Sequence, residues 1–241
     1  MNPNFPKPTY SVIMLIYHRT QELVDMARDC AASVRQHSKD FEFIIVDNGS
    51  TVRHDWENEC DTYVRLNENK GISRGWNTGL KLSRGRYITI IGDDILVREG
   101  WLEAMKEAME LPNAGVVNPH VEHLPPGTGM VENYKWPSGA CFMLTQKTLN
   151  RVGYFDEEIF PCNTEDWDYW IRVYKAGLKM YRNYSMTVRH KEGQTVHASD
   201  LSIHTQGLLE RLTKKYGFNP VDVFCGDRSI YEAIQNNFAT V

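Results

Sequence analysis

Short apolar runs alternate with amphipathic helical segments over the first half of the chain. The runs have the length of buried strands and lie at residues 11–17, 42–46, 63–66, 86–91 and 115–117. Between the first two, apolar residues recur at helical spacing, at Leu23, Ala27, Cys30, Ala31 and Val34. Continuous apolar strands joined by helices predict βαβ units and a parallel sheet that is covered by helices on both faces. The chain is therefore expected to form an α/β domain.

The composition excludes several classes of protein. The 241 residues are 41% hydrophobic and 24% charged, which fits a soluble globular chain and not a disordered, collagenous or coiled-coil one. No apolar run approaches the roughly 18–20 residues of a membrane span, and the N-terminus lacks the apolar region of a secretory signal. The net charge of -4 argues against nucleic acid as the default partner. Five scattered cysteines without a C-x-x-C pair argue against disulfides and zinc, and favour a reducing cytoplasm.

The second half has a less regular pattern. Residues 120–135 contain a Pro/Gly cluster without hydrophobic period, so we expect a loop there, with 121–134 mobile until a ligand binds. The elements expected after it are a strand at 136–145, a helix at 147–152, a helix capped by Thr164 and ending near Gly177, strands at 179–184 and 187–190, and a helix carrying Leu201, Leu208, Leu209 and Leu212.

Candidate functional residues follow three strands of the predicted sheet. Tyr17, Asp47 and the pair Asp93-Asp94 all fall at strand carboxyl ends, where ligands bind in open α/β sheets. An acidic pair in this position is commonly a solvated turn or a helix cap. The alternative is a divalent-cation site, because Mg²⁺ and Mn²⁺ prefer oxygen ligands and bridge carboxylates to diphosphates.

A second group of candidates lies late in the chain. Glu165, Asp166 and Asp168 open a helix, where acids stabilise the macrodipole, but one of them could serve as a general base. His190 follows a short strand; a lone histidine is usually structural, yet imidazole also joins carboxylates around Mn²⁺.

A glycine-rich stretch spans residues 69–79. It either packs closely at a helix start or offers backbone, arginine and asparagine groups to a phosphorylated ligand, through Asn69, Gly71, Arg74 and Asn77. It is neither a P-loop nor a dinucleotide fingerprint, and no G-x-S-x-G motif is present.

Taken in order, six segments resemble family 2 glycosyltransferases with the GT-A fold, from about residue 10 to residue 195. The matching segments are Ile16-Tyr17-His18-Arg19, Asp47-Asn48-Gly49-Ser50, the stretch from Asn69 to Gly79, Gly153-Tyr154-Phe155-Asp156-Glu157, Glu165-Asp166-Trp167-Asp168 with Arg172 and Ala176-Gly177, and His190 with Gly193 and Thr195. The resemblance implies a Rossmann-like, mostly parallel central sheet flanked by helices, in a single domain with a C-terminal helical extension.

The resemblance also implies roles for individual residues. A nucleotide-sugar donor would contact Tyr17, Arg19, Asp47, Asn69, Gly71, Arg74, Asn77 and Asp93. Asp166 would be the catalytic base, and Asp94 with His190 would bind Mn²⁺ or Mg²⁺. The family's Asp-x-Asp motif is Gly92-Asp93-Asp94 in this chain. Either Asp93 substitutes for the missing first Asp, or Asp94 and His190 hold the metal together with the diphosphate and water.

The resulting hypothesis is an inverting, metal-assisted glycosyltransferase using a nucleoside-diphosphate sugar, with a UDP-sugar favoured. The expected domains are the GT-A domain at 1–217, with a nucleotide-sugar half at about 10–118 and an acceptor half at about 119–217, and an extension at 218–241. The alternatives are a sugar nucleotidyltransferase and a catalytically inactive nucleotide-sugar- or glycan-binding module.

The acceptor and the oligomeric state stay open. Residues 172–216 carry nine Lys or Arg and three Asp or Glu, which suits either a solvated face or an anionic partner. A glycan, a lipid-linked glycan or a modified nucleobase could each accept the sugar. We expect a cytoplasmic location, either free or peripheral at a membrane.

Overall fold

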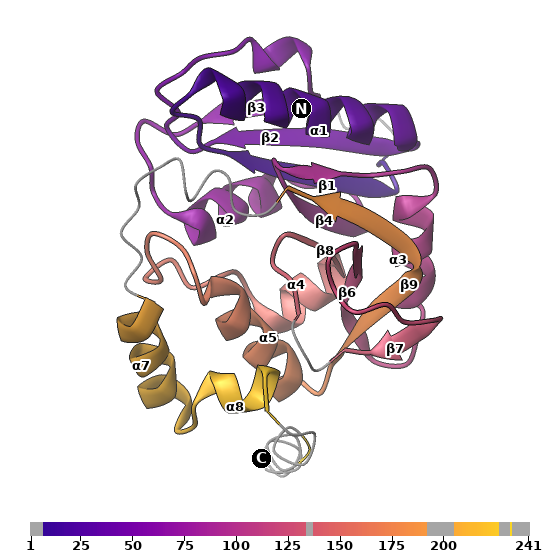
Figure 1. Ribbon diagram of the computed structural model, residues 1–241, viewed down its shortest axis with the longest axis vertical. Helices are drawn as coiled ribbons and strands as arrows, with labels where there is room; N and C mark the ends of the chain where they lie inside the picture. The colour runs from indigo at the N-terminus through magenta and orange to yellow at the C-terminus, as the bar shows by residue number, and fades with distance from the viewer. Residues whose placement is uncertain (1–6, 134–136, 192–204, 227–231, 233–241) are drawn as a thin grey trace.

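The computed structural model describes residues 7–133, 137–191, 205–226 and 232 of the chain. Its strands are β1 (Tyr10–Ile16), β2 (Phe41–Asp47), β3 (Thr62–Arg65), β4 (Tyr87–Gly92), β5 (Ile95–Leu96), β6 (Ala114–Val121), β7 (Met130–Glu132), β8 (Cys141–Thr145) and β9 (Lys179–His190). Its helices are α1 (Gln21–His37), α2 (Ile72–Leu82), α3 (Trp101–Met109), α4 (Gln146–Val152), α5 (Glu165–Lys175), α7 (Thr205–Tyr216) and α8 (Pro220–Phe224), with a 3₁₀ turn η1 (Trp56–Asn58). These elements confirm the predicted α/β class (Figure 1).

The strands form one sheet in the order β3-β2-β1-β4-β8-β6-β9-β5, and β7 pairs with β9 beside this path. The pairs β1–β2, β1–β4, β2–β3 and β6–β9 are parallel. Strand β8 runs antiparallel to both β4 and β6, and β5 and β7 run antiparallel to β9. The first half is thus parallel as predicted, and the sheet becomes mixed where β8 enters it.

Helices cover both faces of the sheet, which explains why its strands are continuously apolar. On β1, Val12, Met14 and Ile16 pack with α1 and α3 in one hydrophobic cluster. Ile13 points to the opposite face and packs in a second cluster with α2, α4, α5 and α8. Each such fully buried side chain contributes about 1.5–3 kcal/mol.

The two strands predicted at 179–184 and 187–190 are one strand, β9. Its pairing with β6 shifts register between Asn183 and Thr187, so the strand has an irregularity where the sequence pattern breaks. The Asn183 side chain accepts hydrogen bonds from the Ser185 backbone N–H (2.9 Å) and hydroxyl (2.7 Å). This local bonding replaces the ladder, and the strand continues to His190.

The loop predicted over 120–135 is in part strand, and that prediction was wrong there. Strand β6 continues through Pro119 to Val121, and β7 adds Met130–Glu132 on the edge of β9. The end of β6 contains polar residues and a proline, so its sequence pattern does not indicate a strand. Pairing with β9 nevertheless holds this segment in the sheet.

The C-terminal part of the described chain packs onto the domain. Val223 and Phe224 of α8 are buried in the second cluster, and the Phe224 ring lies 5.4 Å from that of Trp167. The expected boundary at 217/218 stays a prediction. The expected strand at 136–145 begins at Cys141, while its first residue, Trp136, and Leu201 of the last predicted helix lie outside the described residues.

Two further expectations concern cysteines and membrane spans. All five cysteines are free. In the described part of the chain, no helix combines the length and the apolar character that crossing a bilayer requires.

Helix α2 lies against β1 at glycine positions. A Cβ on Gly79 would lie 2.4 Å from Cγ2 of Ile13, and one on Gly75 would lie 2.3 Å from Cδ1 of Leu15. These glycines are therefore required for close packing, which is the structural alternative considered for the 69–79 stretch. The same approach brings the start of α2 to the edge where the strands end.

We predict that Gly79→Ala lowers the free energy of unfolding by about 1–3 kcal/mol, because the added methyl overpacks against the branched Ile13 side chain. Gly207→Ala in α7 is the matched control, since no atom lies within 4 Å of its added Cβ. There the better helix propensity of alanine should raise stability by up to about 1 kcal/mol. Chemical denaturation measures both; equal gains in the two variants would contradict the close packing.

Candidate active site

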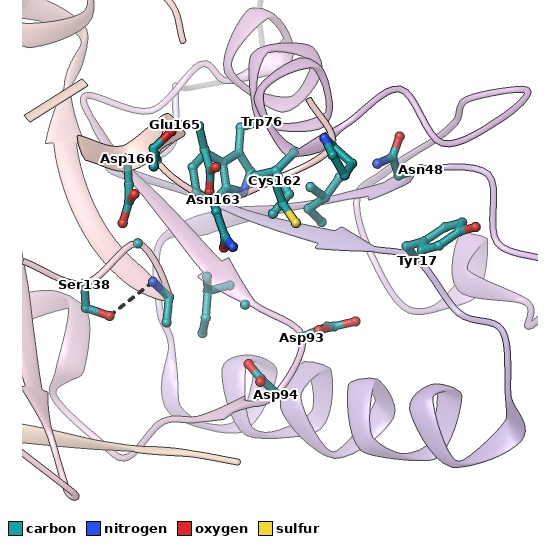
Figure 2. Close-up of a pocket in the computed structure, with 18 of the residues that line it drawn as sticks. Tyr17, Asn48, Trp76, Asp93, Asp94, Ser138, Cys162, Asn163, Glu165 and Asp166 are labelled. Atoms are coloured by element: carbon teal, nitrogen blue, oxygen red, sulfur yellow. Dashed lines mark hydrogen bonds between the residues drawn. The ribbon is translucent and has the colours of Figure 1, made fainter. Parts of the chain in front are cut away.

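A pocket of about 490 Å³ opens at the carboxyl ends of β1, β2 and β4. Register explains its position, because Ile16 pairs with Asp47 and Leu15 with Gly92, so three chain segments leave the sheet together. The antiparallel β8 begins at this same edge, where the Gly92 N–H donates to the Ala140 carbonyl (2.7 Å). Figure 2 shows Tyr17 and Asn48 on one side of the pocket, Asp93 and Asp94 near the end of β4, and Glu165 and Asp166 across from them.

Tyr17, Asn48 and Asn69 line one part of the pocket. The Asn48 side chain donates to Oδ1 of Asn69 (2.9 Å) and accepts from the Lys70 N–H (2.9 Å). Asn69 also accepts from the Gly71 N–H (2.9 Å), which fixes the entry into α2. Three of the predicted donor-binding residues, Tyr17, Asn69 and Asp93, therefore line the pocket, together with Asn48, which was not predicted.

Asp47 is not among the residues that line the pocket. Its side chain is 2% exposed and accepts bonds from the Tyr63 hydroxyl (2.9 Å), the Arg65 guanidinium and the Ser50 N–H (2.7 Å). In this arrangement Asp47 shapes the 47–50 turn that carries Asn48. A contact with the nucleotide base stays a prediction.

Asn77 and Arg74 face the segment that follows α4 and are not among the lining residues. The Asn77 amide donates to the Phe155 carbonyl (2.9 Å) and accepts from the Phe155 N–H (2.9 Å). Arg74 pairs with Glu157 (3.2 Å). These contacts anchor residues 155–157, so both side chains are engaged in the fold.

Gly71 and Arg19 likewise lie outside the pocket lining. Gly71 has a positive φ of 84°, and an added Cβ would lie 2.9 Å from the Phe160 ring. Arg19 is exposed. The donor contacts expected of both stay predictions.

Each carboxylate of the Asp93-Asp94 pair faces its own histidine. Nε2 of His18, which is 0% exposed, lies 3.1 Å from Oδ2 of Asp93. Nε2 of His190 lies 3.2 Å from Oδ2 of Asp94. The β5–β9 pairing produces the second contact, because Ile95 pairs with His190 and the Lys191 N–H donates to the Asp94 carbonyl (3.0 Å). Asp94 and His190, almost one hundred positions apart, thus lie side by side, and their role as metal ligands stays a prediction.

The Asp94–His190 pair fits a divalent cation. A carboxylate oxygen and an imidazole nitrogen side by side at a pocket are a donor set that Mn²⁺ accepts. Within the described residues, no group of three or more His, Cys, Asp and Glu side chains could hold a metal. Such an ion would thus take its remaining ligands from a bound diphosphate and water, as Mg²⁺ and Mn²⁺ commonly do.

Glu165 and Asp166 open helix α5 at the opposite side of the pocket. Oδ1 of Asp166 accepts from the Trp167 N–H (2.9 Å). Burial raises the pKa of Asp166 to about 6. Backbone N–H groups around the carboxylate lower its pKa, but their effect is smaller than that of burial. Burial, with the charge of Asp166 next to it, raises the pKa of Glu165 to about 8. The two neighbouring carboxyl groups therefore keep a proton at higher pH than exposed carboxyl groups do.

Asp168 has a different role from its two neighbours. It is 0% exposed and accepts bonds from Arg172 Nε (2.8 Å), Lys215 Nζ (2.6 Å) and the Tyr216 hydroxyl (2.6 Å). It does not line the pocket. Asp168 instead fastens the end of α7 to α5, and this leaves Glu165 and Asp166 as the carboxyl groups of the helix start that line the pocket.

Several basic residues of 172–216 are paired within the chain. Arg211 contacts Glu158, and Lys215 also binds Asp156 (2.8 Å). Lys179 pairs with Glu132 (2.8 Å). Much of the local positive charge therefore neutralises the chain's own acids.

The pocket contains residues that the sequence did not indicate. Ser138, Gly139 and Ala140 precede β8, Asn163 and Thr164 precede α5, and Leu209 comes from α7. A recognisable signal existed for the first group, since Ser-Gly directly before an apolar run marks the start of a strand at a sheet edge. For Leu209 there was none, because only tertiary packing brings α7 to the pocket.

Comparison with known proteins agrees with this geometry. Glycosyl transferase family 2 matches residues 11–167, more than half of the chain. Glycosyltransferase GlyG of Streptococcus pneumoniae is 31% identical over 117 residues, which cover 44% of this chain and 37% of GlyG. Chondroitin synthase of Escherichia coli is 24% identical over 244 residues, covering 89% of this chain and 34% of that protein. The chain thus spans about a third of the length of these two curated relatives.

Solved structures share the fold. The crystal structure of GalNAc-T7 with UDP, GalNAc and Mn²⁺ superposes with a TM-score of 0.70 at 14% identity, over 97% of this chain and 55% of that one. The GT-A fold predicted from the order of six motifs is confirmed. The chain belongs to glycosyl transferase family 2.

Proposed function

We propose that the protein is an inverting glycosyltransferase that moves a sugar from a nucleoside-diphosphate sugar, with a UDP-sugar favoured, to an acceptor hydroxyl. The observation that carries this proposal is the pocket itself, in which the Asp166 carboxyl group lies across from Asp94, whose side chain contacts His190. A base and a metal-binding pair on opposite sides leave space for a sugar between them. GalNAc-T7, with the same fold, binds UDP and Mn²⁺.

The proposed reaction is a single in-line displacement. The acceptor oxygen attacks the anomeric carbon, the bond from that carbon to the diphosphate breaks, and the nucleoside diphosphate leaves. Asp166 accepts the proton of the acceptor hydroxyl as the new bond forms. A cation held by Asp94 and His190 would neutralise charge on the leaving diphosphate.

Glu165 has a defined place in this proposal. Burial and the neighbouring charge make it costly for both adjacent carboxyl groups to ionise, and a proton kept by Glu165 would leave Asp166 free to act as the base. Tyr17, Asn48 and Asn69 would receive the nucleoside part at their side of the pocket.

We predict that Asp166→Asn lowers turnover about 10²–10⁴-fold, because an amide of nearly the same shape cannot accept the proton. Dissociation constants for UDP-sugars should stay close to those of the wild type. Release of UDP from a panel of UDP-sugars, with and without candidate acceptors, gives the rate. Glu165→Gln is the matched control and should retain most of the activity. If Asp166→Asn keeps more than about a tenth of the wild-type rate, the base is another residue.

The pH profile offers an independent test. Since the pKa of Asp166 is raised to about 6, the fraction of ionised base grows as the pH rises through that value. We expect kcat/KM to increase from pH 5 to pH 7 and then level off. The residual activity of Asp166→Asn should not show this increase of kcat/KM between pH 5 and pH 7. A flat wild-type profile between pH 5 and pH 7 would oppose this assignment.

We predict that Asp94→Ala weakens UDP-sugar binding in Mn²⁺ and removes the stimulation by the ion, because it leaves His190 as the only member of the pair. Calorimetry with Mn²⁺ and with EDTA measures the effect. Asp93→Asn decides between the two alternatives for the incomplete metal motif, since the amide oxygen can still contact His18. If Asp93→Asn and not Asp94→Ala abolishes the metal dependence, Asp93 replaces the missing ligand.

A further inference from the structure

The backbone directly before α5 has an uncommon conformation. Asn163 and Thr164 have φ angles of 74° and 72°, so two successive residues with side chains are left-handed. This region is disfavoured for residues with a Cβ, and asparagine tolerates it better than most. A conformation of this kind persists only where the surrounding structure imposes it, and such residues cluster at functional sites.

Helix capping does not account for this conformation. Thr20 and Thr145 occupy the N-cap positions of α1 and α4 with extended backbones, and the side chain of each accepts a bond from a helix N–H. Thr164 occupies the same position at α5, yet its side chain makes no capping bond. Its buried Oγ1 has no hydrogen-bond partner among the described residues. The left-handed turn therefore gives up the threonine cap that α1 and α4 use.

The turn does place polar side chains in the pocket. Both Asn163 and Thr164 line it. In Figure 2 the Asn163 side chain reaches into the pocket from the side of Glu165 and Asp166, toward the end of β4 that carries Asp93 and Asp94. Its amide thus points from the side of the proposed base toward the end of β4, into the pocket where the proposed reaction puts the sugar. An amide offers both a donor and an acceptor, which suits a sugar hydroxyl.

We propose that Asn163 binds a hydroxyl group of the donor's sugar and that the left-handed turn before α5 serves to present its amide. This inference rests on the proposed function, because it requires a nucleotide sugar in the pocket. It makes Asn163 a determinant of which sugar is transferred. The unpaired Thr164 hydroxyl, 6% exposed and lining the same pocket, is a second polar group on that side.

The deciding experiment is Asn163→Gly, because glycine adopts a positive φ freely and lacks the amide. We expect the variant to unfold in one thermal transition like the wild type, while the affinity for the UDP-sugar that the wild type binds best falls about fivefold or more. The affinity for UDP alone should not change. Thermal melting follows unfolding, and titration calorimetry with UDP and with a panel of UDP-sugars measures the affinities. The differences in affinity among the UDP-sugars should become smaller than in the wild type.

Asn113→Gly is the matched control, since Asn113 also has a positive φ, of 57°, and lies outside this pocket. It should likewise unfold in one thermal transition and leave nucleotide binding unaltered. If the wild type binds a UDP-sugar more tightly than UDP and Asn163→Gly changes that preference by less than about twofold, the inference is wrong and the proposed function stands. If the wild type binds no nucleotide sugar, both this inference and the proposed function are wrong.

Discussion

The register between β1, β2 and β4 is the constraint on which the site depends. Because Ile16 pairs with Asp47 and Leu15 with Gly92, the residues after these three strands leave the sheet at one level. A slip of one residue would turn every side chain of a strand to the other face, and both faces of this sheet are buried. The buried core therefore fixes where Tyr17, Asn48 and Asp93 emerge.

Pairing between strands that are distant in the sequence then adds a histidine to the site that the parallel strands form. Strand β9 pairs with β6, β7 and β5, and its last residue brings an imidazole to the Asp94 carboxylate. Three further polar groups hold the surrounding segments in place: Asp47 in its turn, Asn77 on residue 155, and Asp168 between α5 and α7. The acidic side chains that line the pocket lie in two places, Asp93 and Asp94 after β4, and Glu165 and Asp166 at the start of α5.

Much of this could be predicted from the sequence, and the exceptions have physical causes. The strands of the first half were predictable because their pattern is local, and the six motifs in order pointed to the family. The sequence alone could not show the contacts that Asp47, Asn77 and Asp168 make within the chain, because the same side chains can also bind a ligand. The donor contacts expected of Asp47 and Asn77 stay predictions. The end of β6 and the place of Leu209 depend on tertiary pairing, which leaves no local periodicity.

The attachment of α7 to α5 affects how the pocket can change in sequence among related chains. One side of the pocket comes from β1, β2 and the start of α2, whereas Leu209 comes from a helix far along the chain that Lys215 and Tyr216 hold through Asp168. Substitutions on the pocket side of α7 can accumulate without altering the strands or this anchor. Related chains can thus change the part of the pocket wall that α7 supplies while the opposite side stays unchanged, so that one side of a binding cavity evolves independently of the other.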